Sequence, residues 1–288
     1  HAGLTYPGEA DALRDGLAEI LNHEPAPAPR QDLVGIAAPH VSIEGGRACY
    51  RSAYRLLSPE LANRTFVVLG TSHHGAPDRF GLTRKPFSTP LGETVTAARL
   101  VDELVEKAAA ALDPEDYCHS IEHSIEFQVL FLQHLFGPAV RLLPILCGAY
   151  VRSFTEGGKP EADPAVDAFL AALREIAERE GERLFWVLGV DLAHIGRRYG
   201  DPVPAAAARG VMLDVAKRDR SRLELAVSGD ADGFWESVCR NRDPLHWCGS
   251  SAIYTFLKAL PGARGEVEHY DQWNIDEESV VSFAALSF

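Results

Sequence analysis

Apolar positions follow two different patterns along the chain. Segments in which apolar residues recur at helical spacing predict helices, and they lie at 8–22, 45–57, 94–112, 124–136, 163–180 and 248–260. Short, nearly continuous apolar runs predict buried strands at 32–40, 65–74, 140–148 and 183–194, and two closing segments also have strand character, 265–273 and 279–288. A Pro- and Ala-rich connector at 24–31 is too short to separate two domains.

The alternation of these elements predicts the class of fold. Parallel neighbouring strands need a long crossover, which is usually a helix, so strands that alternate with helices imply a largely parallel sheet. We expect the two closing segments to add antiparallel strands at an edge. The predicted fold is α/β, with a mostly parallel or mixed central sheet flanked by helices. In such sheets, functional sites gather beyond the carboxyl ends of the strands.

Polar residues of metal-binding or acid–base types follow three of the predicted strands. The first strand ends at His40, and the second ends at the adjacent pair His73 and His74. The fourth strand runs into Asp191, with His194 three residues further on. Because these strand ends are expected at one edge of the sheet, we expect the side chains to lie near one another.

Two predicted helices begin with residues of the same kinds. Cys248 opens a helix beside Gly249, where backbone N–H groups and the helix dipole favour a thiolate. His123 heads another helix, with Glu122 and Glu126 nearby. A role in packing, turn capping or helix-start charge is an alternative for all of these residues, namely His40, one of the 73–74 pair, Asp191, Cys248, Glu122 and Glu126.

The convergence of several such segments on one face of the sheet favours a site over packing alone. Neutral imidazoles and a thiolate are ligands for a first-row transition ion, and their softness favours iron, copper or zinc over magnesium or calcium. The carboxylate and the remaining histidines would then orient ligands or move protons. The sequence has no GxGxxG, P-loop, HExxH or GxSxG motif, so it lacks the usual signals of dinucleotide binding, phosphoryl transfer and serine hydrolysis.

Composition narrows the function classes further. The 288 residues are 46% hydrophobic and carry a formal net charge of −13, which argues against nucleic-acid binding. No apolar run approaches the length of a membrane span. The five cysteines form no CxxC pair, which favours a reducing compartment and predicts a cytoplasmic protein. The sequence begins at His1 rather than Met, so we expect the natural N-terminus to be missing or processed, and no signal-peptide pattern is visible.

Seven short motifs, taken in order, resemble those of a known family. They are HAGLTYPG at the start, APH at 38–40, LGTSHHG, EHSIEFQ, LLPILCG, DLAHIG and CGSS. Their order and spacing resemble the Memo family, which includes the AmmeMemoRadiSam system protein B of bacteria and archaea. The resemblance covers essentially the whole chain and implies one Memo-like α/β domain over 1–288. It also implies a fold similar to that of the class III extradiol dioxygenases (LigB-like), which are non-haem iron enzymes.

The resemblance implies a role for individual residues. The proposed metal ligands of the family correspond to His40, His74 and Cys248, and its further cleft residues, which would be catalytic, correspond to His123, Asp191 and His194. We expect the remaining histidine of the pair, His73, and also Glu126 to support the cleft. The implied cofactor is a transition-metal ion, iron(II) first, with copper or zinc as alternatives. Many members have a small residue and a glycine after the first metal histidine, whereas this chain has Val41 and Ser42, with Glu44 nearby.

Two functions are compatible with these residues. The first is a metal-dependent redox protein, an oxidoreductase with a dioxygenase-like fold, acting in an AmmeMemoRadiSam-type system. The second is a non-catalytic adaptor that binds a peptide or protein in the same cleft. Expected partners are a small-molecule or peptide ligand and, by the resemblance, radical-SAM and AMMECR-type proteins. Nucleic acid and membrane are not expected. The chain has no CxxxCxxC motif and is therefore no radical-SAM enzyme itself.

Overall fold

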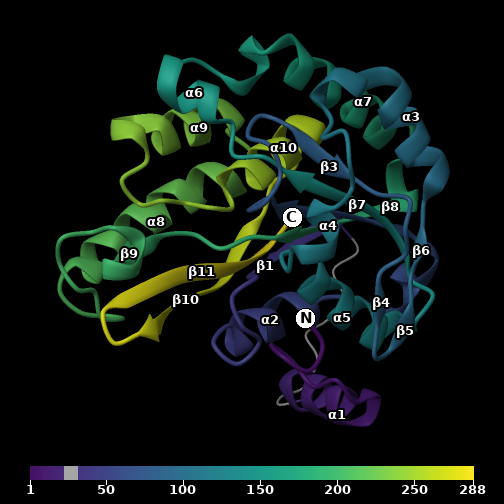
Figure 1. Ribbon diagram of the computed structural model, residues 1–288, viewed down its shortest axis with the longest axis horizontal. Coiled ribbons are helices and arrows are strands. Elements are labelled where there is room, and N and C mark those ends of the chain that lie inside the picture. Colours follow the sequence, from purple (N-terminus) through teal and green to yellow (C-terminus); the bar gives the residue numbers. More distant parts are fainter. Residues whose placement is uncertain (23–31) are drawn as a thin grey trace.

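A mixed β-sheet runs through the centre of the protein (Figure 1). The computed structural model describes residues 1–22 and 32–288, so the connector predicted at 24–31 lies outside the described residues. The strands follow one another across the sheet in the order β10 (Glu266–Asp276), β11 (Ser279–Ser287), β1 (Gly35–Ala38), β8 (Leu184–Gly189), β2 (Thr65–Thr71), β7 (Arg141–Cys147) and β3 (Phe80–Leu82). Two short strands join this path, β6 (Val95–Thr96) beside β7 and β9 (His194–Gly196) beside β11.

The middle of the sheet is parallel and its margins are antiparallel. Strands β1, β8, β2 and β7 run parallel to one another, whereas β11 pairs with β1 and β10, and β3 with β7, in antiparallel fashion. The predicted α/β fold with a mixed, mostly parallel sheet is therefore confirmed, as is the antiparallel character of the closing strands. A separate two-stranded ribbon consists of β4 (Ser88–Thr89) and β5 (Gly92–Glu93).

Helices cover both faces of the sheet (Figure 1). The α-helices are α1 (Ala10–Leu21), α2 (Arg47–Tyr54), α3 (Ala98–Ala108), α4 (Cys118–Ile121), α5 (Glu126–Phe136), α6 (Val151–Glu156), α7 (Pro164–Glu180), α8 (Val211–Val227), α9 (Ala231–Cys239) and α10 (Ser250–Ala259). Short 3-10 turns lie at Pro59–Asn63, Ala109–Ala111, Pro160–Ala162, Gly181–Arg183, Arg197–Tyr199 and Arg240–Arg242. The apolar patterns at 8–22, 45–57, 94–112, 124–136, 163–180 and 248–260 all fall on helices, whereas α4, α6, α8 and α9 were not predicted.

Two apolar cores result, one on each face of the sheet. Alternate residues of β2 face opposite sides, so Val67 and Leu69 enter one core while Phe66 and Val68 enter the other. The first core is shared with α3, α7, α8, α9 and α10, and the second with α1, α2 and α5. Burial on both faces explains why the parallel strands read as continuous apolar runs. None of the helices in the part of the chain that the structure describes is long and apolar enough to cross a membrane.

The register of the central strands brings their carboxyl ends to one level. Ala38 of β1 and Gly70 of β2 both pair with Gly189 of β8, which lies between the two strands. The segments that follow these strands therefore leave the sheet side by side. This shared edge positions the candidate site. All strands of the main sheet fall between residues 35 and 287, and the prediction of a single domain over 1–288 stays a prediction.

Candidate metal centre

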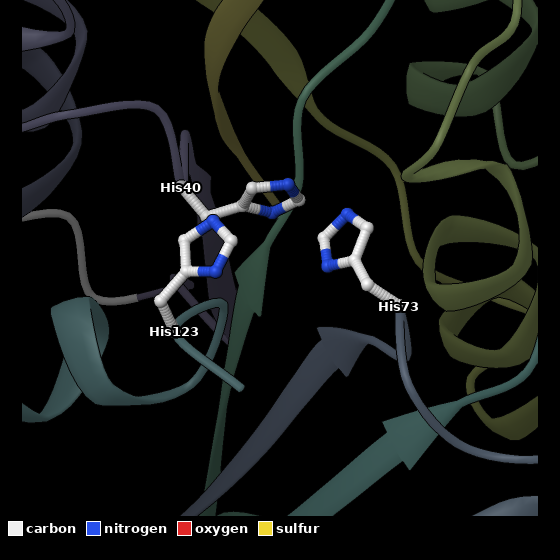
Figure 2. A group of neighbouring side chains, drawn as sticks. All are labelled: His40, His73 and His123. Atoms are coloured by element: carbon white, nitrogen blue, oxygen red, sulfur yellow. The ribbon is translucent and has the colours of Figure 1, made fainter. Parts of the chain in front are cut away.

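Three histidines meet beyond the carboxyl edge of the sheet (Figure 2). His40 follows β1, His73 follows β2, and His123 lies in the loop before α5. One nitrogen from each ring lies within 4.8 Å of one nitrogen of each of the others. The ring centroids are 5.1 Å apart for His40 and His73, 5.3 Å for His40 and His123, and 5.4 Å for His73 and His123. Such a convergence suits a single ion bound by imidazole nitrogens.

Hydrogen bonds determine which nitrogen of His40 is available. Its Nδ1 lies 2.9 Å from the carbonyl oxygen of Gly189. A carbonyl oxygen only accepts, so Nδ1 carries the proton and Nε2 presents its lone pair. The ring is buried, and this burial, reinforced by nearby His73, lowers the pKa of His40 to about 3. His40 is therefore a neutral imidazole at neutral pH.

Glu122 holds the other two histidines. Its side chain, 1% exposed, lies 3.0 Å from Nδ1 of His73 and 3.3 Å from Nδ1 of His123. Its carboxylate oxygens also accept hydrogen bonds from the backbone N–H groups of His73, His123 and Ser124. A carboxylate behind a histidine fixes the ring orientation and leaves Nε2 for a metal, as in carboxylate–histidine–metal triads. Glu122 was expected only near the start of a helix, and its contacts depend on a loop fold that the local sequence does not encode.

The contacts of Glu122 also shift the pKa values of the groups at the site. Burial opposes ionisation of Glu122, but its hydrogen bonds with His73 and the charge of that ring prevail and lower the pKa of the carboxyl. Conversely, burial disfavours the charged form of His73, yet Glu122 raises its pKa. His123 differs, because burial and the nearby His40 lower its pKa to about 4.

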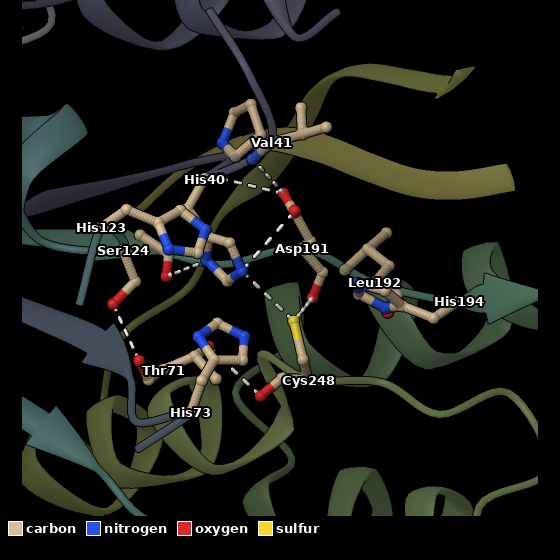
Figure 3. A network of polar contacts seen from close by, with 12 residues as sticks. His40, Val41, Thr71, His73, His123, Ser124, Asp191, Leu192, His194 and Cys248 are labelled. Carbon is tan, nitrogen blue, oxygen red and sulfur yellow. Dashed lines mark hydrogen bonds and ion pairs between the residues drawn. The ribbon is translucent and has the colours of Figure 1, made fainter. Parts of the chain in front are cut away.

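Asp191 closes the site on the side of β8 (Figure 3). It is buried, and its Oδ1 accepts hydrogen bonds from the backbone N–H groups of His40 at 2.9 Å and Val41 at 3.2 Å. Its Oδ2 lies 3.5 Å from Nε2 of His40. Burial raises the pKa of Asp191. This carboxyl therefore fixes the turn after β1 and stands beside the ring nitrogen that faces the site.

Cys248 lies next to the same nitrogen. Its Sγ is 3.4 Å from Nε2 of His40 and 3.7 Å from the carbonyl oxygen of Asp191 (Figure 3). Thr71 at the end of β2 donates its hydroxyl to the Cys248 carbonyl at 3.2 Å, which connects this loop to the sheet. Burial raises the pKa of the Cys248 thiol well above its ordinary value, and the charge of Asp191 adds to this. The influence of the helix start, which favours a thiolate, is outweighed here.

The other predicted site residues lie around this group. His74 is exposed, and its ring centroid is 6.4 Å from that of His73. His194 has its Nδ1 3.0 Å from the carbonyl oxygen of Leu192, and burial lowers its pKa. Glu126, at the start of α5, accepts a hydrogen bond from Tyr6. The three-histidine group thus contains His73 rather than His74, and it does not include Cys248. The ligand roles of His74 and Cys248, like the catalytic roles, stay predictions.

The unusual residues after the first histidine are part of a hydrogen-bonded turn. Val41 is buried, and its carbonyl accepts a 2.8 Å hydrogen bond from Tyr50 of α2. The Ser42 hydroxyl accepts from the backbone N–H of Gly45 at 3.2 Å. Glu44 is exposed and lines a separate groove between α1 and α2. The side chains that replace the small residues therefore shape this turn, and the Asp191 carboxylate stabilises it by accepting the backbone hydrogen bonds of His40 and Val41.

The donor set fits the metal that the sequence implies. His40 and His123 are neutral by virtue of burial, and His73 has its Nδ1 bound to a carboxylate, so each ring can offer Nε2. Imidazole nitrogens suit zinc, copper and iron, and the adjacent thiol of Cys248 is a softer donor of the same preference.

A comparison with known families identifies the family of the chain. A family model described as Memo-like protein matches residues 1–287. The fold is of the α/β class, and the match over almost the whole chain shows that the chain belongs to the Memo family. The resemblance inferred from the seven motifs is thereby confirmed. The family shares the fold of the class III extradiol dioxygenases.

Curated relatives carry the same family description. A MEMO1 family protein of Aquifex aeolicus is 25% identical over 298 residues, covering 100% of this chain and 71% of the relative. A MEMO1 family protein of Methanopyrus kandleri is 25% identical over 302 residues, which cover 100% of this chain and 96% of the relative. A MEMO1 family protein of Thermococcus kodakarensis is 28% identical over 266 residues, which cover 87% of this chain and 85% of the relative.

Proposed function

We propose that this Memo family member is a metal-dependent redox protein that binds one iron(II) ion through His40, His73 and His123. Copper and zinc are the alternatives that the same donors accept. The observation that carries the proposal is the convergence of three imidazoles within 4.8 Å. Two of them have Nδ1 hydrogen-bonded to oxygen acceptors at 3.0 Å or less. A packing role would not require lone pairs of three separate segments to converge.

The ion would supply one-electron redox chemistry and open coordination positions for a small ligand. The protein's own residues contribute orientation and proton handling. Glu122 and Gly189 fix the ring planes through Nδ1, so that Nε2 stays aimed at the site. The Oδ2 atom of Asp191 stands 3.5 Å from Nε2 of His40. We propose Asp191 and the neighbouring His194 as the groups that hold or move a proton for a bound ligand.

The adjacent pair His73 and His74 gives a sharp test. We would measure metal content by mass spectrometry after anaerobic purification and reconstitution with iron(II), copper or zinc. We would compare the metal content of His73→Ala with that of the parent, of His74→Ala and of Cys248→Ser. We expect near-stoichiometric metal in the parent and a loss of affinity of at least about tenfold in His73→Ala. His74→Ala is the matched control, since it removes the adjacent histidine that lies outside the three-histidine group and should leave metal content unchanged.

Different losses would assign the ligands differently. Metal lost in His74→Ala and Cys248→Ser, but retained in His73→Ala, would restore the ligand set that the family resemblance implies. No metal in the parent after reconstitution with any of the three ions would reject a metal-dependent function and favour the non-catalytic adaptor. Reversible oxidation and reduction of the bound ion, followed by electron paramagnetic resonance, tests the redox part. A bound ion without redox change, such as zinc alone, would reject that part.

The cysteines and the family resemblance also support a proposal for the cellular location and the partners of the protein. We propose a cytoplasmic location, on the basis of the unpaired cysteines, and action beside radical-SAM and AMMECR-type proteins. All five cysteines are free in the structure. Co-purification of the tagged chain with these partners from its own cells is the direct test. Recovery of the chain without either partner would count against a shared system.

A further inference from the structure

A buried polar cluster lies between α8 and the two closing strands. Its centre is Asp219 of α8, which is 0% exposed. Its Oδ1 accepts a hydrogen bond from the indole N–H of Trp247 at 2.7 Å. Its Oδ2 accepts from the hydroxyls of Tyr270 in β10 at 2.8 Å and Ser282 in β11 at 2.6 Å. Burying a carboxyl group is costly unless hydrogen bonds compensate, so this cluster fixes donors from separate segments at one point.

The segment before Cys248 has a backbone conformation that side chains rarely adopt. Asn241, Arg242, Asp243 and His246 all have φ angles between 49° and 57°. Residues other than glycine are uncommon in this left-handed region. Such strain persists only where the surrounding contacts impose it. The segment would therefore relax if the contacts that hold it were removed.

Those contacts meet at Trp247, which is 3% exposed. Its backbone N–H donates to Oδ2 of Asp243 at 2.6 Å, and its indole N–H donates to Asp219. The guanidinium of Arg222 lies 5.2 Å from the indole ring and pairs with Asp243 at 2.7 Å. Both the backbone and the side chain of Trp247 are therefore held by the polar groups of α8 and of the strained segment.

The residues that follow Trp247 reach the metal centre (Figure 3). The Sγ atom of Cys248 lies 3.4 Å from Nε2 of His40, and the backbone N–H of Gly249 donates to the carbonyl oxygen of Asp191 at 3.1 Å. A nitrogen and a sulfur donor on one tetrahedral ion, at about 2.1 and 2.3 Å from it, lie about 3.6 Å apart. The thiol thus stands at a distance from His40 that suits a shared ion, and its position depends on the residue before it.

We propose that Asp219 is a positioning residue of the metal centre, which acts through Trp247 to hold the Cys248 thiol beside His40. Without the indole hydrogen bond the strained segment relaxes, and the thiol leaves the side of His40 on which Nε2 lies. The consequence for metal affinity rests on the proposed metal binding, whereas the position of the thiol can be tested without any ion.

The alkylation rate of Cys248 in the metal-free protein measures its release. Iodoacetamide labelling is followed for each cysteine by peptide mass spectrometry. When local opening is fast relative to labelling, the rate follows the population of the open form. We expect Trp247→Phe to raise the rate at Cys248 at least about fivefold, because it removes one buried hydrogen bond. Cys49 and Cys147, which are buried in the two cores, serve as references and should keep their rates.

Matched variants separate positioning from a general loss of stability. Tyr270→Phe also removes one hydrogen bond to Asp219, but Tyr270 lies in β10 and not beside Cys248, so the parent rate is expected. Asp219→Leu removes the acceptor and should behave as Trp247→Phe does. Asp219→Asn should restore the parent rate, because the amide oxygen can still accept from the indole while the two hydroxyls can accept from the amide.

Iron(II) affinity, measured by competition with a chelator, tests the link to the metal centre. We expect it to fall about tenfold in Trp247→Phe and Asp219→Leu, as for other residues that orient ligands from behind. Tyr270→Phe and Asp219→Asn should keep the parent affinity. A parent that binds no iron, copper or zinc would reject the proposed function, whereas the labelling rates would still decide whether Asp219 positions the thiol.

Three results would overturn the positioning role. The first is an unchanged rate at Cys248 in Trp247→Phe. The second is an equal acceleration in Tyr270→Phe or at the two reference cysteines, which would reveal a general loosening of the fold. The third is an unchanged iron affinity in a variant that releases the thiol, which would separate Cys248 from metal binding. Because Trp247→Phe leaves Asp219 in place, the test stands even if Asp219→Leu fails to fold.

Discussion

The Nδ1 atom of His40 lies 2.9 Å from the carbonyl oxygen of Gly189, across the pairing of β1 and β8. The residue that accepts this hydrogen bond must be small. A Cβ placed on Gly189 would lie 2.1 Å from the carbonyl oxygen of Ser124. Ser124 follows His123, so the glycine at this position lets two histidine-bearing segments approach each other.

We therefore expect Gly189→Ala to disturb the site more than its size suggests. The added methyl group must displace the backbone beside His123, which should cost about 1–3 kcal/mol of the free energy of unfolding. Metal affinity should fall with it. Urea unfolding and metal titration measure the two effects. Gly16→Ala is the control, because nothing lies within 4 Å of a Cβ there and helix α1 should be slightly stabilised, by up to about 1 kcal/mol.

Glu122→Gln tests the shared carboxylate. The amide keeps the shape of the side chain but removes the charge that orients His73 and His123, so metal affinity should fall about 10–100-fold. The pKa of His73 should fall as well, since Glu122 is what raises it. Competition with a chelator gives the affinity, and NMR titration of the imidazole gives the pKa. Unchanged affinity would show that Glu122 serves the loop alone. Glu115→Gln, at an exposed position, is the control.

Arg222 and Asp243 form a buried ion pair that supports the loop before Cys248. The two atoms Nη1 and Oδ1 are 2.7 Å apart, and the side chains are 4% and 10% exposed. The second carboxylate oxygen, Oδ2, accepts the backbone N–H of Trp247 at 2.6 Å. Arg222→Met leaves a buried charge unpaired and should lower the free energy of unfolding by about 3–5 kcal/mol.

Two comparisons check this interpretation by urea unfolding. The double variant Arg222→Met/Asp243→Asn removes both charges and should recover part of the lost stability. Arg84→Met breaks an exposed pair with Asp102, whose side chains are 56% and 58% exposed, and should change stability by less than about 1 kcal/mol. Equal losses from the buried and the exposed pair would contradict the role of burial.

His119 should make stability depend on pH. Its pKa is lowered by burial to about 4, whereas an unfolded histidine titrates near about 6.5. As the pH falls below the unfolded value, the unfolded chain takes up a proton that the folded chain does not. Stability is therefore full above about pH 6.5 and falls until about pH 4, by up to about 3 kcal/mol from this residue.

The difference between the protein and His119→Phe isolates that effect from other titrating groups. Lowering the pH from 7.5 to 4 should lower the midpoint of thermal unfolding more for the parent than for the variant. We also expect the variant to be the more stable at pH 7.5, because it loses an unsatisfied buried group, by about 1–3 kcal/mol. Parallel pH profiles for the two proteins would show that His119 titrates in the folded state as it does when unfolded.

Much of the fold could be predicted from periodicity. The parallel strands are buried on both faces, so their apolar runs are long enough to recognise, and the helices between them have clear apolar stripes. The short helices α4 and α6 and the longer helices α8 and α9 were missed. α8 is rich in charged residues, and its buried face includes Asp219 and Arg222, which form internal polar contacts instead of an apolar stripe.

The candidate site was predicted only in outline. His40 and His73 could be placed at the sheet edge because their strands were recognisable. The sequence could not decide between His73 and His74, since adjacent residues in extended chain point to opposite sides and only the loop beyond β2 determines which side faces the site. Glu122 was noted only as a carboxylate near a helix start, because its partners lie in a loop whose course depends on tertiary contacts.

The position of β8 also has a consequence for how the protein is made. It lies between β1 and β2 in the sheet, although a ribosome synthesises it after both. The segments with all three histidines therefore leave the ribosome before the strand that aligns them exists. Long-range pairings of this kind form late in folding. A nascent chain would carry the imidazoles without the Gly189 carbonyl and the Asp191 carboxyl, so the ion should enter only once translation has passed the middle of the chain and the sheet has closed.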